Sequence, residues 1–405
     1  MSDIHSIYTY DYELPEERIA KFPVEPRDAS KLLVYRNHEI ISTAFKSIAD
    51  FFPKDTLIVF NNTKVVHARL FFSTPTGATV EIFCLEPLQP VKDLKQNADR
   101  SDNVQWKCFI GNKKRWKTGD LKASILIPSV GEVELKVKYI NADEDAHVVE
   151  FQWSNPDVIF ADILEYFGAL PIPPYLNRES NDEDEDSYQT MFAKHHGSVA
   201  APTAALHFTS QVIEECKAKG VTVGEVTLHV GAGTFKPVKT DSIEDHTMHS
   251  EFVSVSKETI QLLLNHKGPV IPVGTTSMRT LESLYWLGVE FAKGEKGTEV
   301  SQFVWKSGSK LSAQESFTVL IAHLDSINQD NIEFKTSIMI HPGYQFKVCN
   351  GIVTNFHQPK STLMCLVSAL IGVEEVKRMY DFALKNSFRF LSYGDSSLLL
   401  PKVSE

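Results

Sequence analysis

Helical and strand-like spacings of apolar residues alternate along the second half of the chain. Segments with helical spacing are followed by short, continuous apolar runs that end in small residues. This alternation predicts helices at residues 209–219, 256–265 and 278–287, and strands at residues 221–230 and 270–273. Ligands usually bind where such strands give way to small-residue turns and helices, at the carboxyl edge of a sheet.

Further elements are expected on either side of this region. Residues 14–20 read as a short helix, with a proline and acids in its first turn. The short apolar runs at residues 32–35 and 56–60 are bounded by polar residues, as in buried strands. Helical spacing also predicts helices at residues 156–167 and 373–386.

Residues 69–151 have a different texture, made of short alternating segments separated by Gly, Pro, Asn and Asp. Such a pattern is typical of a small all-β barrel or sandwich. We therefore expect an α+β protein. Its discontinuous main domain, residues 1–68 and 152–405, has mixed α/β character with strands surrounded by helices, and residues 69–151 form an inserted all-β, barrel-like domain.

Three other stretches are less strongly patterned. The acidic run at residues 179–186 is predicted to be a solvated loop. Residues 288–335 are polar, with no clear period. The longest apolar run, residues 363–371, is much shorter than the roughly 20 residues that cross a bilayer. The first residues also lack a signal-peptide pattern, so the cytoplasm is the expected location.

The composition is that of an ordinary globular chain with an acidic balance. Its 405 residues include 41 Lys+Arg and 52 Asp+Glu, a formal net charge of −11. This charge argues against a protein that coats DNA or an anionic membrane through its overall field, although a local basic patch remains possible. The five cysteines show no C-x-x-C spacing, which favours a reducing compartment without a disulfide framework or a thiolate zinc site.

Histidines gather between residues 195 and 249, and histidine is the side chain best suited to move protons at neutral pH. A zinc site is disfavoured, because His246-x-x-His249 lacks the Glu of H-E-x-x-H and no cysteine pair accompanies it. His229 lies on the polar face of the strand at residues 221–230, next to a glycine turn. A structural hydrogen-bonding role is the alternative for this residue.

The glycine turn after this strand permits close approach of the backbone to a ligand. However, Gly231-x-Gly233 is not a dinucleotide-binding fingerprint, because the third glycine is missing and Lys236-Pro237 replaces the start of a helix. A methyltransferase, which also needs a glycine loop between strand and helix, is disfavoured on the same ground.

A basic and aromatic stretch lies within the predicted insert, between Asp102 and Asp120, and contains no acid. Basic residues interleaved with aromatic ones suit a phosphate backbone and unstacked bases, and a solvated β-turn is the alternative. The residues concerned include Lys113, Lys114, Arg115 and Lys117, with Trp106, Phe109 and Trp116 among them.

Several longer runs are together more specific than any of these signals. They include Y-D-Y-E-L-P-E-E-R-I-A-K-F-P at residues 10–23, L-I-V-F-N-N-T-K-V at 57–65, V-A-A-P-T-A-A-L-H-F at 199–208, V-T-L-H-V-G-A-G-T-F-K-P-V at 226–238, I-E-D-H-T-M-H-S-E at 243–251, G-T-T-S-M-R-T-L-E-S at 274–283, V-T-N-F-H-Q-P-K-S-T-L at 353–363 and S-Y-G-D at 392–395. In these motifs and in their order, the chain resembles the S-adenosylmethionine:tRNA ribosyltransferase-isomerase family of queuosine biosynthesis from end to end.

The resemblance implies a reaction that composition and spacing alone do not indicate. The ribosyl part of S-adenosylmethionine is transferred to the 7-aminomethyl-7-deazaguanine base of a tRNA with a GUN anticodon, giving epoxyqueuosine with loss of adenine and methionine. No metal or other cofactor is implied, since S-adenosylmethionine is consumed as a co-substrate. We expect a monomer. The alternatives are an S-adenosylmethionine-dependent RNA methyltransferase and a non-catalytic RNA-binding protein.

Residue chemistry within the family motifs suggests three groups of site residues. The reaction needs a base for a C5′ proton and an acid for the departing adenine, and the catalytic candidates are His229, His249, His246 and Asp395. The candidates for substrate binding are Asn61, Asn62, Pro202, Thr203, His207, Phe208, Gly231, Gly233, Thr234, Glu251, Thr275, Thr276, Ser277, Arg279 and His357. The candidates for tRNA binding are Lys113, Lys114, Arg115 and Lys117.

Two features depart from the family pattern. Residues 288–335 form a longer stretch than the family usually has, with no role that the sequence indicates. The pair His195-His196 is also unusual, which weakens any catalytic role for these two histidines.

Overall fold

The computed structural model describes residues 3–74, 76–89, 103–117, 119–128, 130–143, 146–231, 233, 238, 240–295 and 297–401. Contacts between Cα atoms divide the chain into two compact units. Unit 1 comprises residues 1–63, 187–195 and 201–405, and unit 2 comprises residues 64–186 and 196–200. The combination of a mixed α/β unit and an antiparallel, barrel-like unit confirms the predicted α+β class.

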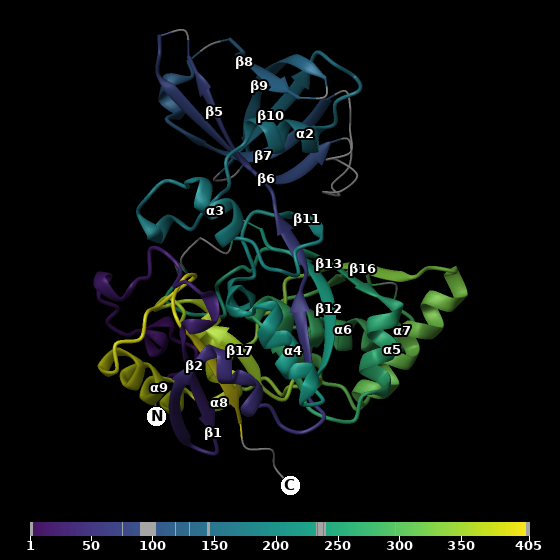
Figure 1. Ribbon diagram of the computed structural model, residues 1–405. Coiled ribbons are helices and arrows are strands. Elements are labelled where there is room, and N and C mark those ends of the chain that lie inside the picture. Colours follow the sequence, from purple (N-terminus) through teal and green to yellow (C-terminus); the bar gives the residue numbers. More distant parts are fainter. Residues whose placement is uncertain are drawn as a thin grey trace. The chain divides into compact units, whose positions relative to one another are not determined.

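Unit 1 is built on a ten-stranded sheet with the order β15-β16-β13-β12-β3-β14-β17-β18-β1-β2 (Figure 1). The strands are β1 (Lys31–Arg36), β2 (Glu39–Ala44), β3 (Leu57–Asn61), β12 (Thr222–His229), β13 (Glu251–Ser256), β14 (Val270–Val273), β15 (Glu299–Val300), β16 (Asn331–Thr336), β17 (Ile352–Asn355) and β18 (Ser396–Leu400).

The four central strands of this sheet, β12, β3, β14 and β17, run parallel to one another. Antiparallel strands flank them, with β13 beside β12 and β18 beside β17. Strand β3 is buried at every position, as expected for a strand covered on both faces. The parallel pairing places the carboxyl ends of the four central strands at one edge of the sheet.

The described residues of unit 1 include six α-helices, namely α4 (Ser210–Ala218), α5 (Lys257–Asn265), α6 (Thr275–Ala292), α7 (Ala313–Ile327), α8 (Thr362–Ile371) and α9 (Val373–Lys385). Helix α7 contacts both α5 and α6, and these two helices contact β12 (Figure 1). None of the helices in the described part of the chain is long and apolar enough to span a membrane.

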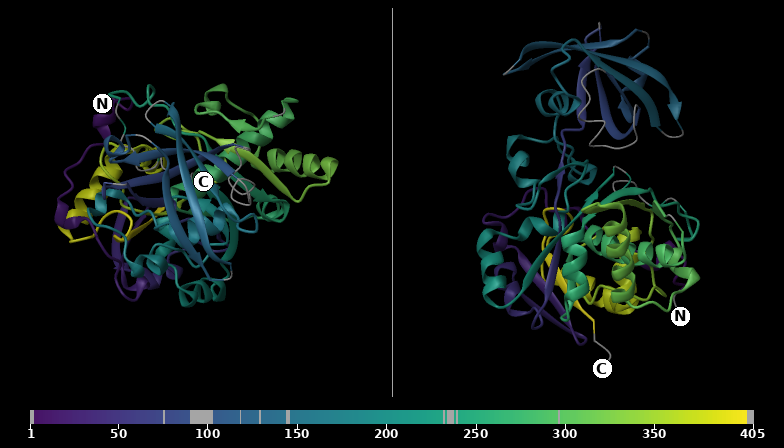
Figure 2. Two further views of the ribbon diagram at one scale, coloured as in Figure 1. Left: turned by 90° about the horizontal axis from the view of Figure 1, so that it is seen from above. Right: turned by 90° about the vertical axis from the view of Figure 1, so that its right-hand side faces the viewer.

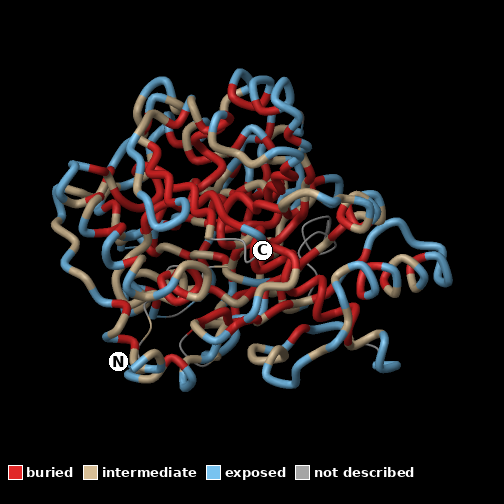
Figure 3. Tube along the Cα trace, turned by 90° about the horizontal axis from the view of Figure 1, so that it is seen from below, coloured by how far each residue is buried: buried red, intermediate tan, exposed pale blue. Residues whose placement is uncertain are grey.

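The opposite face of the central strands packs on α4 and on two 3-10 helices, η4 (Phe45–Asp50) and η7 (Thr203–His207). One hydrophobic cluster joins Phe45 of η4 and Val212 of α4 to Phe60 and Val273 of the sheet. The buried positions, drawn red, fill the interior and the exposed ones surround them (Figure 3).

Unit 2 contains a six-stranded antiparallel sheet with the order β5-β6-β7-β10-β9-β8. The sheet curves until Cα atoms of its two end strands, β5 and β8, come within 8 Å of each other, so it is a nearly closed barrel (Figure 2). The strands are β5 (Arg69–Ser73), β6 (Thr79–Gln89), β7 (Asn103–Gly111), β8 (Leu121–Ile127), β9 (Gly131–Asp143) and β10 (Ala146–Trp153).

Helix α2 (Phe160–Phe167) covers the barrel, and the ring of its Phe160 lies 5.4 Å from Trp106 and 5.1 Å from Phe151. Residues 152–186 therefore group with unit 2 and extend it beyond the predicted insert at 69–151. A separate two-stranded sheet is formed by β4 (Thr63–Val65) and β11 (His195–Ser198).

Some sequence-based predictions of local structure were wrong. Residues 14–20 contain only the 3-10 turn Glu16–Arg18. The acidic run is not a solvated loop, because it forms helix α3 (Asp182–Ser187), whose Asp184 is buried. Both carboxylate oxygens of Asp184 accept hydrogen bonds from the Arg178 guanidinium, at 2.6 and 2.7 Å. This bidentate pair compensates the loss of water from the carboxylate.

The weakly patterned stretch at residues 288–335 contains the 15-residue helix α7. Its N-terminus has a capping box, in which Ser312 and Glu315 satisfy each other's backbone N–H groups. The motif S-A-Q-E could have indicated this helix from the sequence. The apolar run at residues 363–371 is also a helix, α8.

Glu282 of α6 ties the chain that precedes β17 to the interior of unit 1. Its carboxylate is fully buried and accepts hydrogen bonds from the Tyr344 hydroxyl and from the backbone N–H groups of Lys347, Val348 and Cys349, at 2.7–3.0 Å. The indole N–H of Trp286 donates to the same tyrosine oxygen. Each donor would be left without an acceptor if the carboxylate were removed.

We expect Glu282→Gln to lower the free energy of unfolding by about 3 kcal/mol or more, because its amide NH2 would face donors in place of an acceptor. Urea unfolding monitored by circular dichroism measures this change. Glu214→Gln, on the exposed face of α4, is the matched control and should change stability by less than about 0.5 kcal/mol. Equal stability of the two variants would contradict this role of Glu282.

Candidate functional site

The carboxyl edge of the parallel strands brings together residues that are far apart in the sequence. Strand β3 ends at Asn61, β12 at His229, and β17 at Asn355, while β14 leads through Gly274 into α6. Gly274 has a φ of +90°, which a residue with a side chain rarely adopts, and it starts the helix directly after the strand. Family motifs from four parts of the chain therefore meet at this edge.

The side-chain amide of Asn61 extends the pairing of β3 with β12 beyond the last backbone bonds. Its Nδ2 donates to the carbonyl of Leu228 at 2.9 Å, and its Oδ1 accepts from the backbone N–H of Leu228 at 3.0 Å. Nδ2 also lies 3.4 Å from the hydroxyl of Thr276 at the start of α6. Asn61 thus fixes the ends of three elements relative to one another.

Asn62 has a similar structural position. It donates to the Glu225 carboxylate at 2.9 Å and accepts from the Thr227 hydroxyl at 2.7 Å. Glu225 in turn pairs with Lys194 at 2.7 Å. Both predicted asparagines therefore lie at the site but use their amides to hold β12, which makes them positioning residues in this structure.

His229 lies at the end of β12, where it is partly exposed. Its Nδ1 is 2.9 Å from the hydroxyl of Thr63, and its ring stacks on Phe252 of β13 with centroids 5.7 Å apart. These two contacts fix the plane of the imidazole at the carboxyl edge. Sequence analysis did not identify Thr63 or Phe252 as partners of this histidine.

The other two histidines predicted to be catalytic lie on residues 243–250, which have no regular secondary structure. His249 is exposed, and its ring lies against Gly233, where an added Cβ would be 2.2 Å from Cδ2 of the imidazole. His246 is half-buried, and burial, together with the nearby His249, lowers its pKa below the ordinary value. Thr234, another predicted binding residue, lies outside the described residues.

Arg279 and Glu251 form a buried ion pair beside the start of the glycine turn. Nη1 of the arginine contacts the carboxylate, and Nε donates to the carbonyl of Ile338 at 3.2 Å. The second carboxylate oxygen lies 3.4 Å from the N–H of Gly231. Because Glu251 already neutralises Arg279, the pair adds little net charge for an anionic group of a substrate.

His207 is a buried, neutral histidine rather than an accessible acid or base. Asn355 uses its amide NH2 to bind the carbonyls of Leu391 and Ser392, so its oxygen accepts from Nε2 of His207 at 3.3 Å. Nδ1 then accepts from the Ser30 hydroxyl at 2.9 Å. Burial lowers the pKa of His207 to about 4.

His357, which follows β17, is similar. Its Nε2 lies 2.9 Å from the Thr354 hydroxyl, and its backbone N–H donates to Tyr380. Burial lowers its pKa to about 4 as well. By exposed surface, His207 is buried, His229, His246 and His357 are partly exposed, and His249 is exposed; His357 shares the lowered pKa of His207.

Asp395 joins the start of β1 to the turn before β18. One carboxylate oxygen accepts from the N–H of Lys31 at 2.9 Å and the other from the N–H of Arg389 at 2.8 Å. Burial raises the pKa of this carboxyl above its ordinary value. These contacts join the start of β1 to the turn before β18. Each carboxylate oxygen, which a catalytic role would need, already accepts a hydrogen bond.

Several predicted binding residues are part of the interior. Phe208 packs edge-on against Phe45 and Phe60 in the hydrophobic cluster, so it does not line an open purine pocket. The Ser277 hydroxyl donates to the Val273 carbonyl. Pro202 and Thr203 begin η7, next to Gly274, whose added Cβ would lie 3.6 Å from Ala204. Thr275 is the first residue of α6.

The predicted tRNA-binding residues belong to unit 2, in the turn between β7 and β8. Lys114, Arg115 and Lys117 are exposed, whereas Lys113 lies over the ring of Tyr139 at 4.0 Å. The rings of Trp106 and Trp116 are buried in the barrel. These two indoles therefore cannot stack on bases, whereas Phe109 is partly exposed and the basic side chains remain available to a phosphate backbone.

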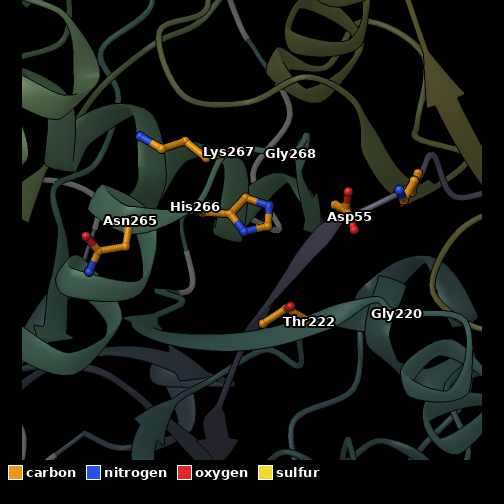
Figure 4. Close-up of a pocket in the computed structure, with 8 residues that line it drawn as sticks. Asp55, Gly220, Thr222, Asn265, His266, Lys267 and Gly268 are labelled. Atoms are coloured by element: carbon orange, nitrogen blue, oxygen red, sulfur yellow. The ribbon is translucent and has the colours of Figure 1, made fainter.

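A pocket of about 350 Å³ opens at the opposite, amino edge of the parallel strands (Figure 4). Lys54, Asp55, His266 and Lys267 line it, together with residues that follow α4 and α5. The last carbonyls of both helices carry the negative ends of their dipoles, so the cationic side chains there complement the helix ends. This explains the charges without a ligand.

Among the described residues, no group of three His, Cys, Asp or Glu side chains is placed to hold a metal ion. The site therefore offers imidazoles, amides and hydroxyls at the carboxyl edge of a parallel sheet, which is an arrangement typical of an enzyme that acts through proton transfer.

Comparison with known proteins identifies the family. The family described as queuosine biosynthesis protein matches residues 7–399, so the chain belongs to it, as the sequence motifs predicted. The S-adenosylmethionine:tRNA ribosyltransferase-isomerases of Sulfurihydrogenibium sp. and Treponema denticola are 36% and 35% identical to it over 397 and 396 residues. Each alignment covers 96% of this chain, and 98% and 99% of the relative.

A crystal structure of an S-adenosylmethionine tRNA ribosyltransferase from Thermotoga maritima is 28% identical. It covers 97% of this chain and 100% of its own, with a TM-score of 0.47.

The neutral state of His207 predicts a pH-dependent stability. In the unfolded chain a histidine has a pKa near 6.5, so that state binds more protons between pH 6.5 and 4. The contribution of neutral His207 to the stability of the folded state is therefore complete above pH 6.5, and it is lost as the pH falls towards 4. The free energy of unfolding of the parent protein should fall between pH 7 and pH 5, and about 2 kcal/mol of this fall should be absent in His207→Gln. Urea unfolding at the two pH values measures the difference.

His38→Gln, at an exposed position in the turn between β1 and β2, is the control and should keep the parent's pH dependence. If His207→Gln also kept it, His207 would not be the neutral, buried group described above.

Proposed function

We propose that this protein is an S-adenosylmethionine:tRNA ribosyltransferase-isomerase. It transfers and isomerises the ribosyl moiety of S-adenosylmethionine onto 7-aminomethyl-7-deazaguanine in a tRNA with a GUN anticodon, and it releases adenine and methionine. The family assignment over nearly the whole chain carries this proposal. We expect a monomeric, cytoplasmic enzyme that needs no metal or redox cofactor.

The chemistry requires groups that can accept and donate protons near neutral pH. The sulfonium of the donor acidifies the C5′ hydrogens, so a base must take one of these protons, and adenine leaves more easily when it is protonated. The amine of the deazaguanine must be neutral when it attacks. His229, His246 and His249 are the imidazoles whose exposure suits these steps.

The positions of the three histidines suggest a division of labour. His246 has a lowered pKa, so it is neutral at pH 7 and suited to accept a proton. His249 is exposed and lies on the glycine turn, within reach of an incoming substrate. We assign these two as the first candidates for base and acid, with His229 as the third imidazole, held by Thr63 and Phe252.

Substrate binding is expected at the same edge of the sheet. The partly exposed Gly231 and Gly233 and the hydroxyl of Thr276 can hydrogen-bond a nucleoside. The buried positions of His207 and Phe208 favour an indirect role for these two residues, through the packing beneath the edge of the sheet. The exposed cations of unit 2 are proposed to contact tRNA phosphates.

Methyl transfer from the same donor is disfavoured by the fold. A methyltransferase glycine loop leads from a strand into a helix whose N-terminus faces the donor. Here β12 pairs antiparallel with β13, and among the described residues between these two strands no α-helix begins.

The products of a single incubation separate the possible functions. With S-adenosylmethionine and tRNA that carries the deazaguanine precursor, we expect adenine and methionine in equal amounts by chromatography. S-adenosylhomocysteine would indicate a methyltransferase, and binding without turnover would indicate a non-catalytic protein. His249→Ala should lower kcat by roughly 10²–10⁴ if it transfers a proton, while His38→Ala should not.

The cations of unit 2 can be tested separately from the chemistry. Replacing Lys114, Arg115 and Lys117 by Ala should raise the KM for tRNA and make log KM depend less steeply on log salt, because fewer counterions are released on binding. Donor affinity, measured by calorimetry, should not change.

Lys113 is kept in this variant, since it packs on Tyr139. The control replaces the exposed Lys122 and Lys138 of β8 and β9. Unchanged tRNA kinetics would contradict the assignment.

A further inference from the structure

The segment that carries His246 and His249 lacks the hydrogen bonds of a helix or strand. Backbone N–H and C=O groups outside regular structure need other partners when they are shielded from water. Two of these groups, the carbonyl of His246 and the N–H of Met248, are bound by one side chain from a distant part of the sequence. That side chain is Gln302.

Gln302 spans the histidine segment with both ends of its amide. Nε2 donates to the His246 carbonyl at 2.6 Å, and Oε1 accepts from the Met248 N–H at 3.0 Å. Only a primary amide of this length offers one donor and one acceptor in a fixed plane. The two bonds bracket Thr247 and therefore fix the backbone between the two histidines.

Gln302 is itself held in place. Its backbone carbonyl accepts from the N–H of Met339 at 2.9 Å, and it lies between β15 and the 3-10 turn Val304–Ser307. The neighbouring Trp305 donates its indole N–H to the Met339 carbonyl at 2.9 Å. This part of residues 288–335, to which the sequence assigned no role, forms a rigid support beside the histidines.

The position of the His249 ring depends on the same backbone. The ring lies on Gly233 so closely that a Cβ there would overlap Cδ2. A shift of the segment by a fraction of an ångström would therefore either press the imidazole into the glycine turn or lift it off. The bond from the Met248 N–H to Gln302 holds the backbone directly before His249.

We propose that Gln302 is a positioning residue of the enzyme, which holds His246 and His249 at the carboxyl edge of the sheet by bridging the backbone between them. The catalytic consequence rests on the proposed function, whereas the structural one does not. Gln302 does not take part in proton transfer, and its effect reaches the reaction only through the two imidazoles.

The charged and titratable groups near residues 243–250 come from the segment itself and from the side chains packed against it. His249 is the group that acts electrostatically on His246. From the packed neighbours, Lys306 pairs with Glu244 at 2.7 Å, and His5 lies 3.5 Å from the same carboxylate. His341 is buried beside Trp305, and Asp245 is exposed next to His246 in the chain. Gln302 adds no charge, so a neutral replacement changes only the hydrogen bonds and the packing.

Gln302→Met tests the bridge, because methionine keeps the length and bulk of the side chain and removes both hydrogen bonds. We expect kcat to fall at least about tenfold, while the KM for S-adenosylmethionine changes by less than twofold. Loosening should also expose His246 to water, so its pKa, followed by NMR titration of the imidazole, should rise towards the ordinary value near 6.5.

Lys306→Ala is the matched control. It removes a contact with Glu244 in the same region, but an exposed one that contributes little. It should leave kcat and the His246 titration as in the parent. If Gln302→Met does not fold, Gln302→Asn serves instead, because it keeps a neutral amide that is one methylene too short to bind both the His246 carbonyl and the Met248 N–H. Its kcat should also fall.

An unchanged kcat and an unchanged His246 titration in the variant would overturn the proposal. The NMR titration of His246 needs no substrate, so it tests the two hydrogen bonds of Gln302 even if the parent protein does not release adenine and methionine. Failure of the parent reaction would instead refute the proposed function. A shifted titration with a normal kcat would show that the bridge is structural only and would overturn the catalytic role of Gln302.

Discussion

The side chain of Asn61 is the contact on which the arrangement of the site depends most. Parallel pairing of β3 with β12 ends at Asn61 and Val226, and the amide of Asn61 then replaces a peptide group by bonding to both backbone groups of Leu228. This keeps β12 beside β3 for two further residues, up to Leu228, directly before His229. Since α6 also begins within reach of Asn61, one buried amide aligns three elements at the edge where the candidate histidines lie.

The histidines of this protein have different roles because their surroundings differ. His207 is a neutral hydrogen-bonding group of the interior and His357 is a partly exposed one, and desolvation lowers the pKa of each to about 4. His229 and His249 have rings oriented by contacts at one side, with Thr63 and Gly233 respectively. His246 lies between these extremes, with a lowered pKa and a backbone that Gln302 holds. We therefore expect proton transfer from His229, His246 and His249, and not from His207 or His357.

The sequence predicted the parts of the fold that have strong local patterns. The strand at 270–273 and the helix near 256–265 were placed within a residue or so, and the order of strand, turn and helix indicated the edge at which the site lies. Helix α7 was missed because residues 288–335 are polar and weakly patterned on both sides of it, which hid the apolar positions of the helix itself. Helix α3 was missed because nothing local indicates that Arg178 pairs with Asp184 in the interior.

The site was predictable by residue type but not by role. The family motifs contain His229, His246 and His249, but they do not distinguish them from His207, whose burial results from packing between Phe45 and Asn355. Gln302 is an isolated residue in a weakly patterned stretch. Its contact with the histidine segment joins residues more than 50 positions apart, which no local pattern could indicate.

We infer that the donor, S-adenosylmethionine, binds at the carboxyl ends of β12, β3, β14 and β17. A crystal structure of the complex with S-adenosylmethionine tests this inference. Electron density for the donor is expected beside His229, Gly231 and the start of α6, with the ribose within reach of His246 or His249. Density at the pocket formed by Lys54, His266 and Lys267, at the other edge of the same strands, would contradict it.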